Sequence, residues 1–409
     1  MELDSREHDR HRPHVSAKPE DNFVIGISGC TSAGKTTLAL LLDVVLREAV
    51  CRMVSNNREH NLVLPPHTAI IHQDAYFFKD GIKRGPMVPV QPLWPEDKLV
   101  VSMTGPDDPP ILVEDRDRVG SCDIELLTKH IDEPDENARA NVPNPRFLTN
   151  LQNRAQTQAR GDDELELERD DISPAAAAAA DELSPETLDA AVEAMRDAFR
   201  RHLTNPSPTP TPDIERIRID DDDPGVPIVV PYRFTVAEGF TLFARDPDHD
   251  PIGRVSPSSD AEAVALRSLR RAQDRFDVPL FLPVDRDEVR TRRFKRERYT
   301  DAPEGARRPG ELWKSGGYFE MVAWPHYERY HQHILPHLAA AYSSDEAFRQ
   351  REHGRPWCAM NAWERDPRVN GVHVRPVAVR SLDETLLWAS SVVGAALAAR
   401  QLQDRDPGS

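Results

Sequence analysis

Cysteine is scarce in this chain, which has four among its 409 residues: Cys30, Cys51, Cys122 and Cys358. They form no Cys-x-x-Cys pair, and their spacing matches no zinc site. Few, scattered cysteines in a long chain are typical of a reducing compartment, so a cytoplasmic protein is expected. Residues 1–20 are charged and lack the apolar stretch of a secretory signal. No run approaches the roughly 18 apolar residues of a membrane helix.

Apolar residues are also few. They make up 39% of the chain, which contains 36 prolines, so part of the sequence is expected to join no packed core. Basic residues are outnumbered by acidic ones, and the formal net charge is -17. An acidic chain has no bulk attraction for nucleic acid or for an anionic membrane, so we expect neither as a partner.

Composition divides the chain into four parts. The third part contains an acidic block, an alanine run and the sequence PSPTPTP, a pattern typical of a low-complexity insertion. Within this insertion, residues 184–201 have the spacing of an isolated amphipathic helix with Ser184 as its cap. The four predicted parts are a disordered tail (1–21), the first part of the core (22–131), a Pro-rich acidic insertion with unknown protein partners (132–227), and the second part of the core with a lid at about 285–325 (228–400).

Outside the insertion, short apolar runs alternate with segments of helical spacing. This alternation predicts a three-layer α/β fold with a parallel, doubly wound sheet. The predicted strands are residues 23–27, 69–72, 234–237, 278–284 and 372–379. The predicted helices are residues 36–50, 123–131, 260–276, 285–298 and 382–397.

The most specific motif is G-x-x-x-x-G-K-[ST], which lies between the first predicted strand and the first predicted helix. Glycines let backbone N–H groups wrap a phosphate, and the positive end of the following helix points at the anion. A lysine here places a charge between the β- and γ-phosphates, and a hydroxyl binds Mg²⁺. A chance glycine-rich turn is the alternative. The predicted ATP-binding residues of this loop are Gly29, Cys30, Thr31, Ser32, Ala33, Gly34, Lys35, Thr36 and Thr37.

Two carboxylates follow predicted strands. Asp74 closes the second strand, where it can accept the proton of an attacking hydroxyl or hold Mg²⁺. Glu238 follows the strand at 234–237 and can orient water bound to the metal. The alternatives are a turn cap for Asp74 and an ordinary strand-end carboxylate for Glu238. Since the chain has no Asn-Lys-x-Asp motif, a GTPase is not expected.

The predicted helix at 285–298 is strongly basic, with Arg292 and Arg296 four residues apart on one face. Such a helix can close over the γ-phosphate as a lid, neutralise charge and exclude water. A solvated charged face and a nucleic-acid patch are the alternatives. The acidic chain and the lack of interleaved aromatic residues argue against the nucleic-acid patch.

These motifs resemble the nicotinamide riboside kinases, within the wider uridine kinase-like group of P-loop kinases. The resemblance rests on ISGCTSAGKTTLA (27–39), HQDAYFFK (72–79), Arg116-Asp117, AEGFTLF (237–243), and Arg292-Arg293-x-x-Arg296 followed by GYFEMVAWP (317–325). With the flanking elements it covers about half of the chain. The resemblance implies a kinase that uses ATP and Mg²⁺ to convert nicotinamide riboside into its mononucleotide in NAD salvage.

By position, the resemblance also implies residue roles: Asp74 as general base and metal neighbour, Thr36 on Mg²⁺, Arg292 and Arg296 on ATP, Asp117 and Arg293 on the ribose, and Phe77 against the nicotinamide ring. The motifs themselves predict Lys35 as the catalytic cation and Glu238 as an acid of the metal site. The chain departs from the family pattern in carrying Ala75 for a second acid and Arg116 for an aromatic residue. The second ring-stacking position falls on Arg298, and a one-residue shift would replace it with Tyr299. A kinase for uridine, cytidine or a related alcohol, and a non-catalytic nucleotide-binding regulator, remain the alternative functions.

Overall fold

The structure is a computed structural model, and it describes residues 22–55, 68–78, 87–90, 111–133, 183–204, 233–245, 260–295, 316–336, 368–376 and 379–403. The predicted tail at 1–21 and most of the insertion lie outside the described residues.

A six-stranded sheet in the order β2-β5-β1-β6-β8-β7 forms the centre of the fold. All neighbouring strands are parallel except the edge pair β7 and β8. Every residue of the central strand β1 is buried, as expected for a parallel strand that is covered on both faces. The prediction of a mostly parallel α/β sheet is confirmed. The strands are β1 (Asn22–Gly29), β2 (Thr68–His72), β5 (Arg233–Gly239), β6 (Val278–Leu282), β7 (Arg368–Val369) and β8 (Val372–Val374).

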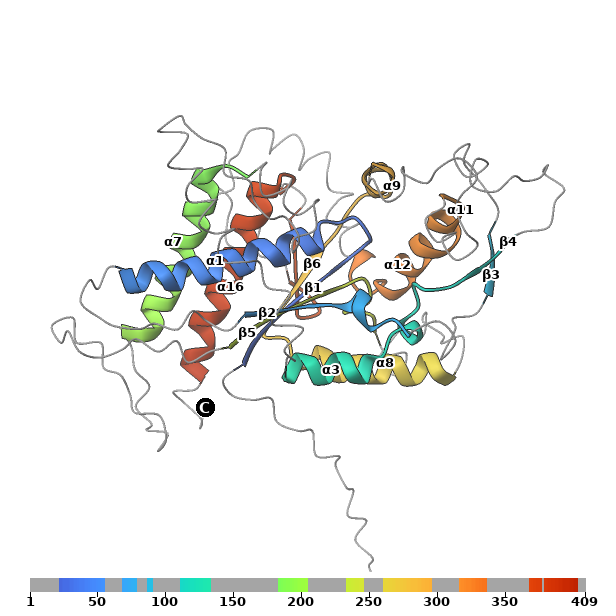
Figure 1. Ribbon diagram of the computed structural model, residues 1–409, viewed down its shortest axis with the longest axis horizontal. Coiled ribbons are helices and arrows are strands. Elements are labelled where there is room, and N and C mark those ends of the chain that lie inside the picture. The colour runs from blue at the N-terminus through green and yellow to red at the C-terminus, as the bar shows by residue number, and fades with distance from the viewer. Residues whose placement is uncertain are drawn as a thin grey trace, which may run out of the picture.

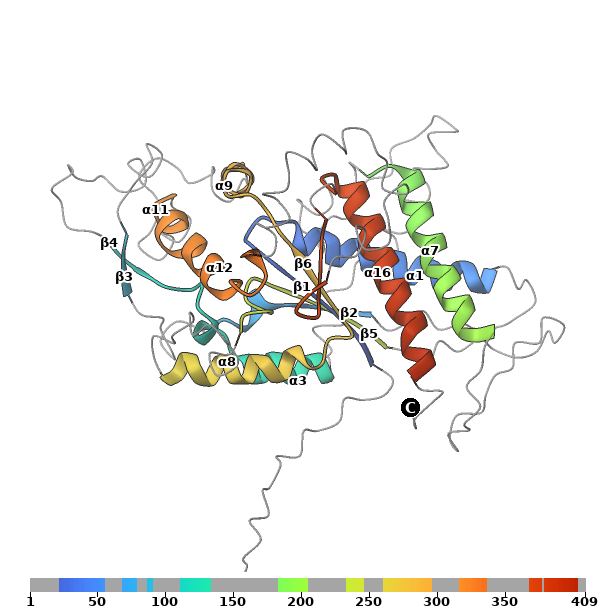
Figure 2. The same ribbon diagram turned by 180° about the vertical axis from the view of Figure 1, so that it is seen from behind.

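Helices cover both faces of this sheet (Figures 1 and 2). On one face lie α1 (Lys35–Ser55), α7 (Pro185–Thr204) and α16 (Leu382–Gln403). On the other lie α3 (Ile124–Asp132) and α8 (Asp260–Gln273), which pack side by side. The Asp123 side chain caps α3 by accepting a hydrogen bond from the Leu126 amide. The arrangement has the three layers expected from the sequence.

Helix α7 corrects the prediction of an isolated helix within the insertion. The helix itself is confirmed, but its apolar face packs on α16 and α1. Val192 and Met195 are fully buried, and the Phe199 ring packs edge-on against Phe234 of β5 with 5.8 Å between ring centroids. Helix α16 approaches closely at Gly394, where an added Cβ would lie 3.3 Å from the Ala198 Cβ. The insertion therefore contributes one helix to the core.

Two predicted elements end earlier than expected. Strand β8 spans Val372–Val374 instead of 372–379. The ladder continues through the Arg375 amide, which donates to the Phe281 carbonyl at 2.9 Å, and ends at Pro376 because proline has no N–H to donate. The basic helix α9 spans Arg286–Phe294, and residues 296–298 of the prediction lie outside the described residues.

The structure also contains several short elements. A hairpin, β3 (Met87–Val90) with β4 (Ile111–Glu114), lies at the end away from α7 (Figure 1). The 3-10 turns η1 (Gln73–Tyr76) and η2 (Val119–Ser121) follow β2 and β4. From Gly316 the chain forms a continuous helical segment: α11 (Gly316–Tyr318), a π-helical turn η5 (Phe319–Ala323) and α12 (Trp324–Tyr330).

One described stretch, Leu382–Arg400 within α16, is long and apolar enough to cross a membrane by length and composition. Half of it is buried inside the protein, where it packs on α7 and α1 and contacts β6. This packing is that of a helix in the core of the fold. The stretch also corrects the expectation that no run approaches the length of a membrane helix.

Candidate active site

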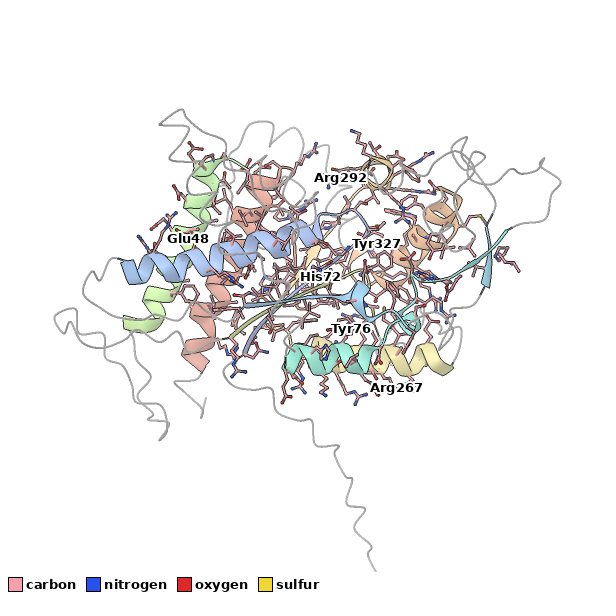
Figure 3. All side chains as sticks on the ribbon, viewed as in Figure 1. Glu48, His72, Tyr76, Arg267, Arg292 and Tyr327 are labelled. Atoms are coloured by element: carbon pink, nitrogen blue, oxygen red, sulfur yellow. The ribbon has the colours of Figure 1, made fainter. Side chains whose placement is uncertain are left out.

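The candidate site lies at the carboxyl ends of β1, β2 and β5, where the glycine loop after β1 meets His72 of β2 and Glu238 of β5. In a parallel sheet this edge is where ligands of α/β proteins bind. Figure 3 shows His72 at this edge and Arg292 above it on α9.

The glycine loop joins β1 to α1 in a conformation that requires its two glycines. Gly29 has φ 156°, and an added Cβ would lie 2.6 Å from the Leu282 carbonyl oxygen. Gly34 has φ 90°, in the region that favours glycine, and an added Cβ there would meet no atom within 4 Å. Gly29 is thus required by close packing on β6, whereas Gly34 is required by the backbone turn.

Lys35 begins α1 and folds back over the loop. Its Nζ donates to the Cys30 carbonyl at 2.9 Å, and the Leu38 amide donates to the Gly34 carbonyl at 2.9 Å as the helix starts. Burial raises the pKa of the Cys30 thiol to about 12, so this side chain is a neutral thiol at physiological pH. The Ser32 Oγ is buried, and the part of the chain that the structure describes offers it no hydrogen-bond partner. A cationic side chain, a helix N-terminus and an unsatisfied hydroxyl together suit an anionic ligand.

Glu238 links the glycine loop to β2. Its Oε1 accepts a hydrogen bond from Thr36 Oγ1 at 2.9 Å and lies 2.8 Å from His72 Nδ1. Burial disfavours the charged carboxylate, but His72, Lys35 and Thr36 outweigh this effect and lower the pKa of Glu238. Burial would lower the pKa of His72, but its hydrogen bond to Glu238 raises it instead. The carboxylate is therefore ionised and fixed beside the Thr36 hydroxyl.

Asp74 belongs to η1, directly after β2, and the residue is exposed. Desolvation by the protein around the carboxylate raises its pKa, and the negative charge of Glu238 raises it further, while Lys35 acts in the opposite direction. A carboxylate with a raised pKa holds a proton more readily than an ordinary aspartate, a property suited to a general base.

Asp117 lies beside the same edge, in the loop between β4 and η2. Its carboxylate accepts a hydrogen bond from the Tyr318 hydroxyl and lies within the electrostatic reach of Arg293. Burial raises the pKa of Asp117, and the Arg293 charge opposes that shift. The predicted pair of Asp117 and Arg293 is therefore brought together at the site.

Arg293 is a buried residue of α9 that contacts the glycine loop. Its Nη1 donates to Thr31 Oγ1 at 3.0 Å, and its guanidinium lies 5.8 Å from the centre of the Phe319 ring. Arg292, predicted to contact ATP, lies on the exposed face of α9 and pairs with Glu288 one turn earlier. Arg296, Arg298 and Tyr299 lie outside the described residues.

Phe77 and Arg116 are the described residues of the predicted ring-binding region. Phe77 is half-buried, packs against the core and forms a β-bridge with Cys122. Arg116 extends beside Glu114, whose Oε2 lies 3.2 Å from the Arg116 Nη2. The guanidinium charge is thus paired with a carboxylate of the same chain segment.

The donor set around Thr36 fits Mg²⁺ held together with a nucleotide. Within the described ranges, no group of three or more His, Cys, Asp and Glu side chains could hold a metal. Mg²⁺ keeps several waters and uses one or two carboxylates together with substrate phosphates. The Thr36 hydroxyl and the ionised Glu238, with Asp74 nearby, match that requirement.

Three polar residues near the site were missed by the sequence analysis: His72, Tyr318 and His326. His72 precedes Asp74 by two residues at the end of β2, a position that would have identified it as a neighbour. Tyr318 and His326 lie in the helical segment that begins at Gly316, and no local pattern connects them with Asp117, some 200 residues earlier.

Comparison with known proteins identifies no relative: no family model matches the chain, and no curated protein matches it significantly. The residues and their geometry therefore carry the functional proposal.

Proposed function

We propose that this protein is an ATP- and Mg²⁺-dependent kinase that phosphorylates the hydroxyl group of a small riboside, with nicotinamide riboside as the specific candidate. The observation that carries the proposal is the junction of Thr36, Glu238 and Asp74 beside the lysine of a glycine loop. This arrangement supplies a phosphate-binding loop, oxygen ligands for Mg²⁺ and a separate carboxylate base.

Two neighbouring carboxylates would take different roles because their surroundings move their pKa values in opposite directions. The lowered pKa of Glu238 keeps it ionised, as a ligand of Mg²⁺ must be. The raised pKa of Asp74 suits it to accept the proton of the attacking hydroxyl. Mg²⁺ would neutralise charge on the transferred phosphoryl group, and Lys35 would bind the same phosphates from the loop. Catalysis then consists of positioning and charge neutralisation.

The riboside preference follows from Asp117 and Arg293. A carboxylate accepts hydrogen bonds from two adjacent hydroxyls, and a guanidinium donates to them. A site of this kind rejects a substrate that lacks one hydroxyl, because a buried acceptor then loses its partner. Arg116 lies where the family pattern has an aromatic residue, and its positive charge would repel a cationic nicotinamide ring. Because Glu114 pairs with Arg116, this repulsion is weakened.

The test is ADP release and product mass with a panel of alcohols: nicotinamide riboside, nicotinate riboside, uridine, cytidine and a 2′-deoxyriboside. We expect nicotinamide riboside to give the highest kcat/KM and its mononucleotide as product. A Lys35→Ala preparation serves as the blank for contaminating kinases. Faster turnover of uridine would keep the kinase class and overturn the nicotinamide assignment. ATP binding without turnover of any alcohol would favour the nucleotide-binding regulator.

A further inference from the structure

The loop that carries Asp117 is attached to the helical segment of residues 316–336, which begins with α11. The Tyr318 hydroxyl accepts a hydrogen bond from the Arg116 amide at 3.1 Å and donates one to the Asp117 carboxylate. Because a hydroxyl has one proton, accepting from the amide directs that proton to Asp117. Tyr318 is 1% exposed, so water does not compete for this hydrogen bond.

A second attachment lies two residues earlier in the loop. His326 Nε2 lies 2.8 Å from Asp115 Oδ2, and the imidazole ring stacks on Tyr330 with 5.3 Å between ring centroids. Asp115 is 3% exposed, and among the described residues its Oδ1 has no hydrogen-bond partner. Burying a carboxylate that has few hydrogen bonds costs folding free energy, and loss of His326 would leave the Asp115 carboxylate without its ion-pair partner. His326 therefore restrains the backbone from which Asp117 projects.

The same segment also contacts the lid helix. Glu320, two residues after Tyr318, pairs with Arg286 and lies 3.9 Å from the Arg290 Nε on α9. Arg293 of that helix lies over the Phe319 ring and donates to Thr31 of the glycine loop. One helical segment thus supports both the Asp117 loop and the base of the lid.

We propose that Tyr318 and His326 are positioning residues that hold Asp117 and Asp115 so that the Asp117 carboxylate faces two hydroxyls of the riboside. The proposal rests on the kinase function proposed above and adds the device that gives it hydroxyl selectivity. Neither residue takes part in the chemistry. Their loss should therefore change recognition of the sugar more than binding of ATP or the transfer step.

The experiment measures kcat and KM for nicotinamide riboside, for its 2′-deoxy analogue and for ATP in the full-length protein. Tyr318→Phe should raise the riboside KM about tenfold, the scale of a hydrogen bond to a charged group. The KM for ATP should stay within about twofold, because that substrate loses no contact. Preference for the riboside over the 2′-deoxyriboside should shrink by a similar factor of about ten, because the deoxy substrate makes less use of Asp117.

Two further variants separate positioning from general stability. Tyr327→Phe removes the same atom from another buried tyrosine of the same segment, whose ring stacks on Phe281 of β6 with 6.1 Å between ring centroids, so it should leave the deoxy discrimination unchanged. His326→Leu should weaken the discrimination, and His326→Gln should restore it because its amide can donate to Asp115.

If the wild-type protein phosphorylates ribosides but Tyr318→Phe and His326→Leu leave the discrimination unchanged, the positioning role is overturned and the kinase function stands. The same conclusion follows if Tyr327→Phe reduces the discrimination as much as Tyr318→Phe does. If the wild-type protein phosphorylates no riboside at all, the kinase function fails, and the positioning role fails with it.

Discussion

The helical layer on one face of the sheet and the edge of the sheet at the glycine loop are both buried, but with opposite kinds of side chain. Between α7, α16 and α1 most of the buried groups are apolar, such as Val192, Met195 and Phe199. At the sheet edge they include Asp115, Glu238 and Arg293, all less than 10% exposed. Apolar burial stabilises the fold, whereas burial of charge opposes folding unless each charge is paired.

This contrast indicates that the two regions have different effects on stability. Apolar packing in the helical layer stabilises the folded state, and this stabilisation offsets the cost of holding charged groups in a fixed arrangement at the edge of the sheet. Substitutions in the helical layer should therefore lower the free energy of unfolding without changing KM. Substitutions at the edge of the sheet should lower activity without unfolding the protein.

The largest effect is expected in the helical layer. Phe199→Ala should lower the free energy of unfolding by about 3–5 kcal/mol, the range for truncating a buried phenylalanine. Equilibrium urea unfolding measures this loss, and KM values of the protein that remains folded should not change. The control is Leu126→Ala on α3, where the side chain is 41% exposed and the cost should be below about 0.5 kcal/mol. Equal losses in the two variants would contradict the docking of α7.

At the other end, Lys35→Ala should reduce kcat by about 10²- to 10³-fold, since a positioned charge on the transferred phosphoryl group is lost. The midpoint of thermal unfolding should change little because the glycine loop depends on Gly29 and Gly34. Lys129→Ala, an exposed lysine on α3, is the matched control and should retain full activity. A near-normal kcat in Lys35→Ala would contradict the assignment of the glycine loop as a phosphate-binding loop.

Asp74→Asn should reduce kcat by roughly 10²-fold with ATP still bound, the scale of a lost general base. In the wild-type protein the pKa of Asp74 is raised, so kcat/KM should fall as the pH drops through that raised value and Asp74 becomes protonated. In the variant this acid limb should disappear. Collapse of ATP affinity with kcat preserved would identify Asp74 as a metal ligand rather than a base.

The smallest effect belongs to the ion pairs on the surface of the helical layer. Arg52 of α1 pairs with Asp189 of α7 at 2.5 Å and with Glu193 at 3.4 Å. Arg52→Ala should lower the unfolding free energy by less than about 1 kcal/mol, and high salt should reduce the difference further. A loss as large as that of Phe199→Ala would mean that charge rather than apolar packing attaches α7.

Local patterns alone predicted much of the fold and half of the site. Buried apolar runs marked the strands β1, β2, β5 and β6, and helical spacing marked α3, α8 and α16. The glycine loop, Asp74 and Glu238 could be recognised because each lies at the end of a strand, where a parallel sheet gathers its ligand-binding groups. These features depend on neighbours within a few residues in the chain.

What the sequence determined by itself was therefore most of the strands and helices of the main sheet and the residue types at the ends of its strands. It did not predict the hairpin of β3 and β4, strand β7 or the helical segment that begins at Gly316. Only the tertiary structure decided which elements meet. An amphipathic pattern shows that α7 has an apolar face but not which partner covers it. His72 and Glu238 are 166 residues apart, and Arg116 and Tyr318 are 202 apart. Contacts over such distances follow from packing of the whole chain, because no local preference couples residues so far apart.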